Sequence, residues 1–238
     1  MTGLDALSPD EIAARLSGSP EERAALIQAG AEAGVAEAQT VWGQMLLDRG
    51  EESAAVEWFT AAAKQGHLMA LNMLGRCYDL GWGVPIDKAR AAECFRIAAE
   101  RGLEWGMYNY ATALTLGDGV AEDKAAALAW FHKAAVMGNA KAMNYIGSFH
   151  EDGWVVERDM ATAARFYAQA AEGGDFRGQF NHARMLAAEG RTEEALAWIA
   201  RCAETATPTF REKAARWLRT GAIPGLTECG PMLLETAS

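Results

Sequence analysis

The sequence repeats itself at intervals of 36 residues. Helical segments rich in alanine end at Gly66, Gly102, Gly138 and Gly174, and each glycine lies 36 residues after the one before. A repeat of this length holds one supersecondary unit, which buries its apolar face only by stacking on its neighbours. We therefore predict five repeats, three full and two shortened, at residues 35–66, 67–102, 103–138, 139–174 and 175–206.

Each repeat encodes two helices separated by a glycine turn. The first helix carries small residues five positions apart, such as Ala70 and Gly75, which allow a neighbouring helix to approach closely. The turn follows at Gly81 and Gly83, and Asp87 is placed to cap the second helix. The pattern predicts an all-α fold, a right-handed α-solenoid superhelix of antiparallel helix pairs.

The two ends of the chain are predicted to cap this array. Ser8-Pro9 and Ser19-Pro20 are typical helix starts, with proline at the first helical position, and residues 1–34 are therefore predicted to form capping helices. Thr207 opens a further helix within residues 207–238. The tail that follows is expected to be extended and ends in an apolar stretch at Pro231–Leu234.

The repeat at 67–102 has a recognisable pattern of residues: Ala70, Leu74-Gly75 and Tyr78, then Gly81-x-Gly83-Val84 and Asp87, then Ala91, Cys94-Phe95, Ala98-Ala99 and Gly102. This pattern resembles the Sel1-like repeat (SLR) family. The family is a relative of the tetratricopeptide repeat and is built from antiparallel helix pairs. The resemblance implies a role as adaptor or scaffold, without pointing to one reaction.

One departure from the family concerns its disulfides. Secreted members join neighbouring repeats by a disulfide, and the resemblance places those cysteines where this chain has alanine or glycine: Ala98, Ala134 and Ala170 against Gly106, Ala142 and Gly178. Cys202 stands at such a place, but Phe210 occupies its partner's position. The N-terminus also lacks the pattern of a signal peptide, so a reducing cytoplasmic setting is expected.

Composition and motifs exclude several classes of function. The chain has 238 residues and a formal net charge of −10, which disfavours binding to nucleic acid, and it has no apolar run long enough for a membrane helix. No catalytic, cofactor or metal-binding motif is present; His150 and His182 are interpreted as half-buried structural residues, and Cys229 as an exposed thiol. We therefore predict a non-enzymatic protein without cofactor or metal.

A binding face is predicted on the first helices, on the concave side of the superhelix. It consists of the third, sixth, tenth and thirteenth residues of each repeat, which combine aromatic, amide and cationic side chains. The predicted peptide-binding residues are Met69, Asn72, Arg76, Trp105, Tyr108, Thr112, Lys141, Asn144, Ser148, Arg177, Phe180 and Arg184. Asparagine amides can pair with a peptide backbone, and arginine with a carboxylate. The predicted ligand is a partner segment of acidic character or with a free C-terminal carboxylate; the alternative is that the aromatic residues pack between helices.

Other readings of the sequence remain open. Trp82 and Trp154 occupy equivalent turn positions and form either a second binding surface or a contact with the adjoining turn. An alternative function is a self-assembling scaffold that docks its apolar C-terminal tail in a neighbour's groove, or folds the tail back on itself. A further alternative is a non-catalytic subunit of an enzyme system.

Overall fold

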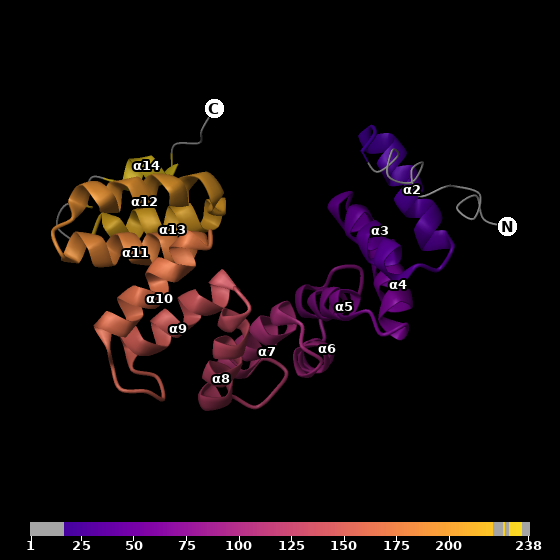
Figure 1. Ribbon diagram of the computed structural model, residues 1–238, viewed down its shortest axis with the longest axis horizontal. Helices are drawn as coiled ribbons and strands as arrows, with labels where there is room; N and C mark the ends of the chain where they lie inside the picture. The colour runs from indigo at the N-terminus through magenta and orange to yellow at the C-terminus, as the bar shows by residue number, and fades with distance from the viewer. Residues whose placement is uncertain (1–16, 221–225, 227–228, 235–238) are drawn as a thin grey trace. The chain divides into compact units, whose positions relative to one another are not determined.

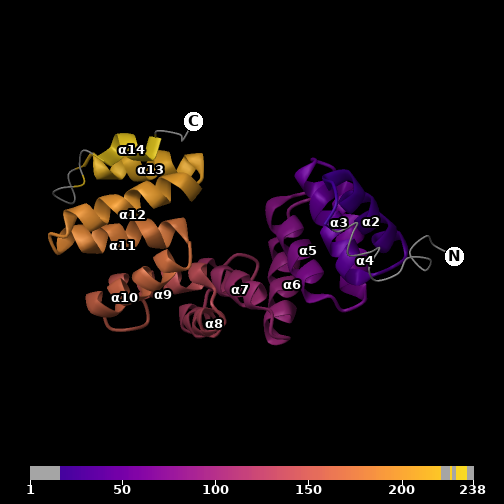
Figure 2. The same ribbon diagram turned by 45° about the horizontal axis from the view of Figure 1, so that its top comes forward.

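The computed structural model describes residues 17–220, 226 and 229–234. Within that part of the chain there are thirteen helices and no strand (Figure 1). The helices are α2 (Pro20–Glu32), α3 (Ala36–Asp48), α4 (Glu52–Lys64), α5 (Leu68–Leu80), α6 (Lys88–Glu100), α7 (Glu104–Leu116), α8 (Lys124–Val136), α9 (Ala140–Asp152), α10 (Met160–Glu172), α11 (Phe176–Ala188), α12 (Thr192–Thr205), α13 (Pro208–Leu218) and α14 (Gly230–Leu234). The all-α solenoid prediction is confirmed, since each helix from α2 to α7, and each from α8 to α12, packs on the next one within its compact part of the chain (Figure 2).

Side chains at the helix starts satisfy backbone groups as the sequence suggests. Ser19 and Glu22 form a reciprocal capping box at α2, with Pro20 at the first helical position. Asp87 and Asp159 accept hydrogen bonds from backbone N–H groups at the starts of α6 and α10. The other predicted capped start, at Ser8-Pro9, lies outside the described residues.

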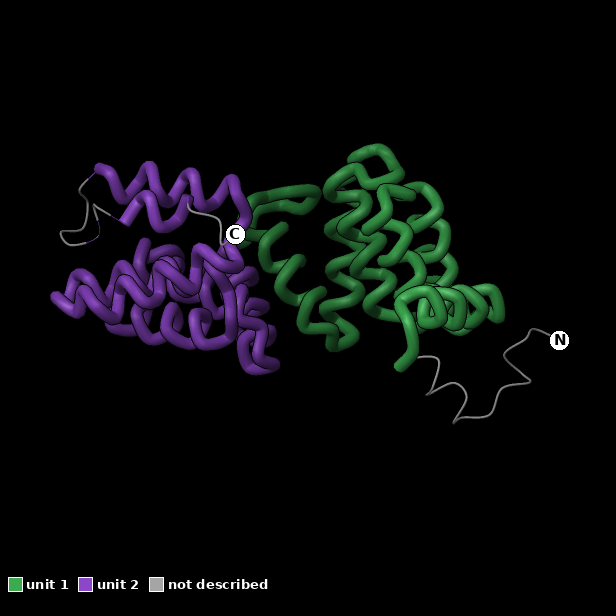
Figure 3. Tube along the Cα trace, turned by 90° about the horizontal axis from the view of Figure 1, so that it is seen from above, with its two compact units in different colours: residues 1–123 green, residues 124–238 purple. Residues whose placement is uncertain are grey.

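The chain divides into two compact units, residues 1–123 and 124–238 (Figure 3). In unit 1, each helix from α2 to α7 packs on the next, and α5 also contacts α7. Its core includes Trp42, Phe59, Met73 and Cys77. The division falls between α7 and α8, inside the predicted repeat at 103–138.

Unit 2 closes its core with the C-terminal segment. The helices α9 to α12 pack in succession, and the short helix α14 packs on α12 and α13. Leu218, Leu226 and Leu233 are each at most 1% exposed within this core. The expectation of an extended tail is therefore wrong for Gly230–Leu234, because Leu233 is anchored between helices of its own chain.

The glycine turns bring one repeat against the preceding one. A Cβ added to Gly83 would lie 2.5 Å from the backbone of Glu52 at the start of α4, and a Cβ added to Gly119 would lie closer still to the carbonyl oxygen of Lys88 at the start of α6. Both glycines have positive φ, of 65° and 71°. At the equivalent position unit 2 has Val155, whose φ of 54° is in the left-handed region that disfavours branched side chains.

Candidate functional site

The first helices α5 and α7 of unit 1, and α9 and α11 of unit 2, carry all twelve predicted binding residues, but these residues differ in burial. Arg177 is exposed, whereas Asn72, Asn144 and Phe180 are only 3%, 6% and 8% exposed. The other eight are partly buried: Met69, Arg76, Trp105, Tyr108, Thr112, Lys141, Ser148 and Arg184. The face is therefore a mixture of accessible side chains and side chains that hold the helices together.

The two buried asparagines join neighbouring first helices. Asn109 on α7 donates from Nδ2 to Oδ1 of Asn72 on α5 at 2.8 Å, and Asn181 on α11 donates to Asn144 on α9 at 2.8 Å. Each pair satisfies an amide oxygen that is withdrawn from solvent. The sequence analysis expected the side-chain amides of Asn72 and Asn144 to pair with a bound peptide, but their oxygens already accept hydrogen bonds from within the chain.

Arg184 is bound within unit 2. Its Nη1 and Nη2 atoms donate to Oε1 and Oε2 of Glu151 at 3.1 and 2.9 Å, and its Nε donates to Oδ1 of Asn181 at 3.1 Å. The side chains of Arg184 and Glu151 are 16% and 21% exposed. The guanidinium also lies 5.6 Å from the ring centre of Trp217. Arg184 therefore acts as a link between α9, α11 and α13.

The carboxylate of Glu151 depends on these donors. Tyr167 donates from its hydroxyl to Glu151 Oε2 at 2.6 Å, and its oxygen lies 3.2 Å from Ser148 Oγ. Burial, the largest single effect, raises the pKa of Glu151, but hydrogen bonds from Arg184 and Tyr167 and the charges of Arg184 and Arg158 together outweigh it and hold the pKa below its usual value. The carboxylate is thus kept ionised in a partly buried place.

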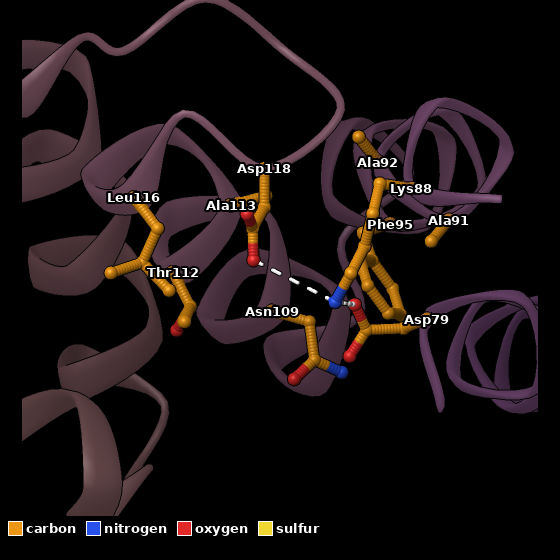
Figure 4. A pocket seen from close by; sticks show the side chains of 10 residues that line it. All are labelled: Asp79, Lys88, Ala91, Ala92, Phe95, Asn109, Thr112, Ala113, Leu116 and Asp118. Atoms are coloured by element: carbon orange, nitrogen blue, oxygen red, sulfur yellow. Dashed lines mark hydrogen bonds and ion pairs between the residues drawn. The ribbon is translucent and has the colours of Figure 1, made fainter. Parts of the chain in front are cut away.

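Unit 1 contains a pocket at the corresponding place, between α5, α6 and α7 (Figure 4). Its volume is about 90 Å³, and its lining residues are Asp79, Lys88, Ala91, Ala92, Phe95, Asn109, Thr112, Ala113, Leu116 and Asp118. Lys88 Nζ lies 2.6 Å from Asp79 Oδ1 and 3.7 Å from Asp118 Oδ2. The hydrogen bond to Asp79 is the main reason that the pKa of Lys88 is raised. The pocket is therefore polar, charged and open to a small group.

Aromatic side chains of the face have different surroundings in the two units. Trp105 and Tyr108 on α7 are partly exposed and meet edge to face, with ring centres 6.2 Å apart. Phe180 on α11 instead packs against Phe210 and Trp217 of α13, at 5.7 and 5.8 Å. Phe180 thus belongs to the contact between α11 and α13, as the alternative interpretation expects.

The two turn tryptophans are each covered by a cation. The guanidinium of Arg76 lies 4.8 Å from the ring centre of Trp82, and the ammonium of Lys124 lies 5.3 Å from that of Trp154. Trp82 is partly buried against the core of unit 1, whereas Trp154 is 37% exposed. Of this pair, Trp154 is the more accessible.

The described cysteines and histidines have structural surroundings. Burial raises the pKa of Cys77 and Cys94 to about 11 and that of Cys202 to about 12, so these thiols stay protonated at neutral pH. Cys229 was expected to be exposed but is 4% exposed, because it lies in the core that α14 completes. None of the four cysteines forms a disulfide bond.

The two histidines in question are half-buried, as expected. The ring of His150 stacks on Phe166 and that of His182 meets Trp198 edge to face. Their buried Nδ1 atoms have no hydrogen-bond partner among the described residues. In that part of the chain no group of three or more His, Cys, Asp or Glu side chains is arranged to hold a metal ion. None of the described helices is both long and apolar enough to cross a membrane.

Sequence reasoning missed the partners that give the face its structure. Asn109 and Asn181 are the seventh residues of their repeats, outside the positions chosen for the face, and Lys88 belongs to a second helix. The spacing of the asparagines could have predicted these contacts, because the two members of each pair are 37 residues apart, which is one repeat plus one position. Helices that stack in successive repeats bring such residues together.

Comparisons with known proteins agree with this architecture. The profile of the Sel1 repeat matches residues 36–67, 68–103, 106–139 and 140–175. A Sel1 repeat protein from Oxalobacter formigenes shares 24% identity over 85% of this chain and 88% of its own, with a TM-score of 0.70. The protective antigen c5321 of uropathogenic Escherichia coli shares 24% identity over 94% of this chain and 51% of its own, with a TM-score of 0.65.

A third solved structure, the immunity protein Pa5087 from Pseudomonas aeruginosa, shares 17% identity over 84% of this chain and 80% of its own, with a TM-score of 0.57. No curated protein matches the sequence significantly. At these identities the solved structures establish the fold alone. The profile covers more than half of the chain, in register with its helix pairs. The chain therefore belongs to the Sel1 repeat family.

Proposed function

We propose that this protein is a non-catalytic interaction protein that binds a segment of a partner protein on its first helices. Sel1 repeat proteins are generally scaffolds for protein–protein interaction. The observation that carries the proposal is the aromatic pair of Trp105 and Tyr108, which is partly exposed on α7. Rigid aromatic side chains that retain exposed surface are typical anchors for a partner.

The aromatic pair lies close to the unit 1 pocket along α7. Thr112, which lines the pocket, follows Tyr108 by four residues, about one helical turn, and its hydroxyl donates to the Tyr108 carbonyl oxygen at 2.9 Å. An apolar anchor beside a polar cavity offers a partner both contact area and orientation. Binding of a partner segment across the aromatic pair and the pocket is therefore the binding mode that we propose for this face.

Fewer cations of the face are available to bind an acidic partner than the sequence suggested. Arg184 is bound to Glu151, and Arg76 covers Trp82, so both serve contacts within the chain. Arg177 is exposed, with its guanidinium 4.6 Å from the ring centre of Phe176. Among the predicted cations of unit 2, Arg177 is exposed and Lys141 is partly buried, so recognition of a carboxylate there would depend chiefly on Arg177.

A capture experiment with matched variants tests the proposal. The full chain is used as bait in a cell lysate, and the captured proteins are quantified by mass spectrometry. The test variant is Trp105→Ala/Arg177→Ala, on first helices. The control is Trp130→Ala/Arg201→Ala, which removes the same residue types from the second helices α8 and α12; Arg201 is exposed and stacks on Trp198 as Arg177 does on Phe176.

We expect a partner that the wild type and the control retain and that the test variant loses at least about tenfold, or about 1.4 kcal/mol of binding free energy. Equal recovery by all three proteins would remove the first-helix face from the mechanism. Equal loss from the two variants would show that binding depends on general integrity of the fold, and would also contradict the proposal.

A further inference from the structure

Units 1 and 2 contain the same asparagine-linked pair of first helices. Asn72 and Asn109 in unit 1 correspond to Asn144 and Asn181 in unit 2, because 144 − 72 = 181 − 109 = 72, the length of two repeats. Both pairs form the same Nδ2 to Oδ1 hydrogen bond of 2.8 Å. The surroundings of the asparagine pair in one unit can therefore be compared, position by position, with those in the other.

In unit 2 a guanidinium fills the space beside the asparagine pair. Arg184 donates to both carboxylate oxygens of Glu151 and to the amide oxygen of Asn181. The hydroxyl of Tyr167 donates to the same carboxylate. This arrangement is a complete binding site for an arginine side chain, occupied by the protein's own residue.

In unit 1 the equivalent acceptors are present without a guanidinium. Asp79 stands at the position of Glu151 and Asn109 at that of Asn181, but Thr112 stands where unit 2 has Arg184. The pocket of about 90 Å³ lies at this place, lined by all three residues. Phe95 also replaces Tyr167, so no hydroxyl reaches into the pocket from α6.

The amide oxygen of Asn109 marks the difference most clearly. Its counterpart in Asn181 accepts hydrogen bonds from Nε and Nη2 of Arg184, at 3.1 and 2.9 Å. Among the described residues, none donates a hydrogen bond to Oδ1 of Asn109, whose Nδ2 is bound to Asn72. An acceptor is thus placed beside the pocket in the position where unit 2 receives a guanidinium.

The charge of the pocket also favours a cation. One ammonium, that of Lys88, faces the carboxylates of Asp79 and Asp118, at 2.6 and 3.7 Å. The three groups carry a net charge of −1, so one incoming positive charge makes the cluster neutral (Figure 4). A guanidinium offers several donors in one plane, which suits a carboxylate and an amide oxygen better than a single ammonium does.

We propose that the unit 1 pocket binds an arginine side chain supplied by the partner segment, at the place that Arg184 occupies in unit 2. This inference rests on the proposed function and specifies the chemistry of the partner. The arginine places its guanidinium beside Asp79, Asn109 and Asp118. The remainder of the segment is then able to contact Trp105 and Tyr108 on α7.

A titration with small probes tests the pocket without a partner. Nα-acetyl-arginine N-methylamide is added to the full chain, and the side-chain amide signals of Asn109 are followed by ¹⁵N-edited NMR. We expect saturable shifts with a dissociation constant of about 1 mM, as is reasonable for a single side chain. The citrulline analogue, which has nearly the same shape but no charge, is expected to bind at least about tenfold more weakly.

Two variants and a control locate the binding. Thr112→Arg supplies the missing guanidinium from the chain itself and is expected to abolish the shifts. Asp79→Asn keeps the shape of the pocket and is expected to weaken binding at least about tenfold. Asp48→Asn removes an exposed carboxylate of unit 1 outside the pocket and is expected to leave binding unchanged.

The inference is overturned by the absence of shifts at ten times the expected dissociation constant, or by equal binding of the citrulline analogue. Binding of free arginine without binding of the blocked form would also overturn it, because the pocket would then serve a small molecule. If capture of a partner succeeds and the titration fails, only this inference falls. If the titration succeeds and capture fails, the preference of the pocket remains and the proposed function falls.

Discussion

At the scale of single residues, Val155 has the least favourable backbone conformation among the described non-glycine residues. It is the only one of them with positive φ, and it stands where the other turns have Gly83 and Gly119. A left-handed conformation raises the energy of a residue with a Cβ by about 1–2 kcal/mol, and a branched side chain is particularly unsuited to it.

We expect Val155→Gly to stabilise the protein by about 0.5–1 kcal/mol, after allowance for the greater freedom of glycine in the unfolded chain. Urea denaturation gives the free energy of unfolding. Gly119→Ala is the opposing control and should destabilise, because its Cβ meets the backbone of Lys88. A loss of stability in Val155→Gly would mean that the valine side chain contributes more than the strain costs.

Glu151 makes stability depend on pH. Its folded-state pKa lies below the unfolded value, so its contribution is complete above the unfolded pKa and is lost as pH falls through the folded pKa. We expect Glu151→Gln to make the free energy of unfolding less dependent on pH below about pH 5. Denaturation midpoints measured from neutral to acidic pH check this. An unchanged acid dependence would contradict the role given to the Arg184 and Tyr167 hydrogen bonds.

The sequence predicted the face residues as a set, but not which of them would be buried. Asn144 and Phe180 follow the same helical spacing as Arg177, yet only Arg177 is exposed. The difference comes from residues in other helices, Asn181 for Asn144 and Phe210 for Phe180. Periodicity within one repeat holds no information about such contacts, so binding by the remaining face residues stays a prediction.

At the scale of helices, the bond between Asn72 and Asn109 joins α5 to α7 across the repeat. Asn109→Ala leaves the buried oxygen of Asn72 without its donor and should destabilise by about 1–3 kcal/mol. The double variant Asn72→Ala/Asn109→Ala should lose less than the sum of the single variants, with a coupling of about 1 kcal/mol. Strict additivity in urea denaturation would show that the bond adds no stability.

The helices themselves were largely predictable, because their boundaries depend on local chemistry. Ser19 and Asp87 cap helices where the sequence analysis placed them, Asp159 caps α10 in the same way, and Gly81 ends α5 in a left-handed conformation. The helix α14 was not predicted, since its five residues lack a periodic pattern and depend on burial of Leu233. The limits of the predicted repeats and capping segments stay a prediction.

At the scale of the molecule, stability is expected to be local to each unit, since every repeat packs mainly on its neighbours. Leu233→Ala removes a fully buried side chain and should destabilise unit 2 by about 2–5 kcal/mol. Hydrogen exchange should then become faster in α12 and α13 and remain unchanged in α3 to α5. Met232→Ala, at a residue that is 37% exposed, is the control. Equal acceleration in both units would indicate a single cooperative unit.

The recurrence of the asparagine link after 72 residues sets the step by which such an array can be lengthened or shortened. Duplication of the repeat at 67–102 or at 139–174, or deletion of the repeat at 103–138, would place a sixth-position asparagine opposite a methionine or tyrosine and leave a buried amide unmatched. Duplication of the repeats at 67–102 and 103–138 together would preserve both asparagine pairs. Duplication of repeats in pairs is therefore the change in length that we expect to destabilise the fold least, in natural variants or in engineered ones.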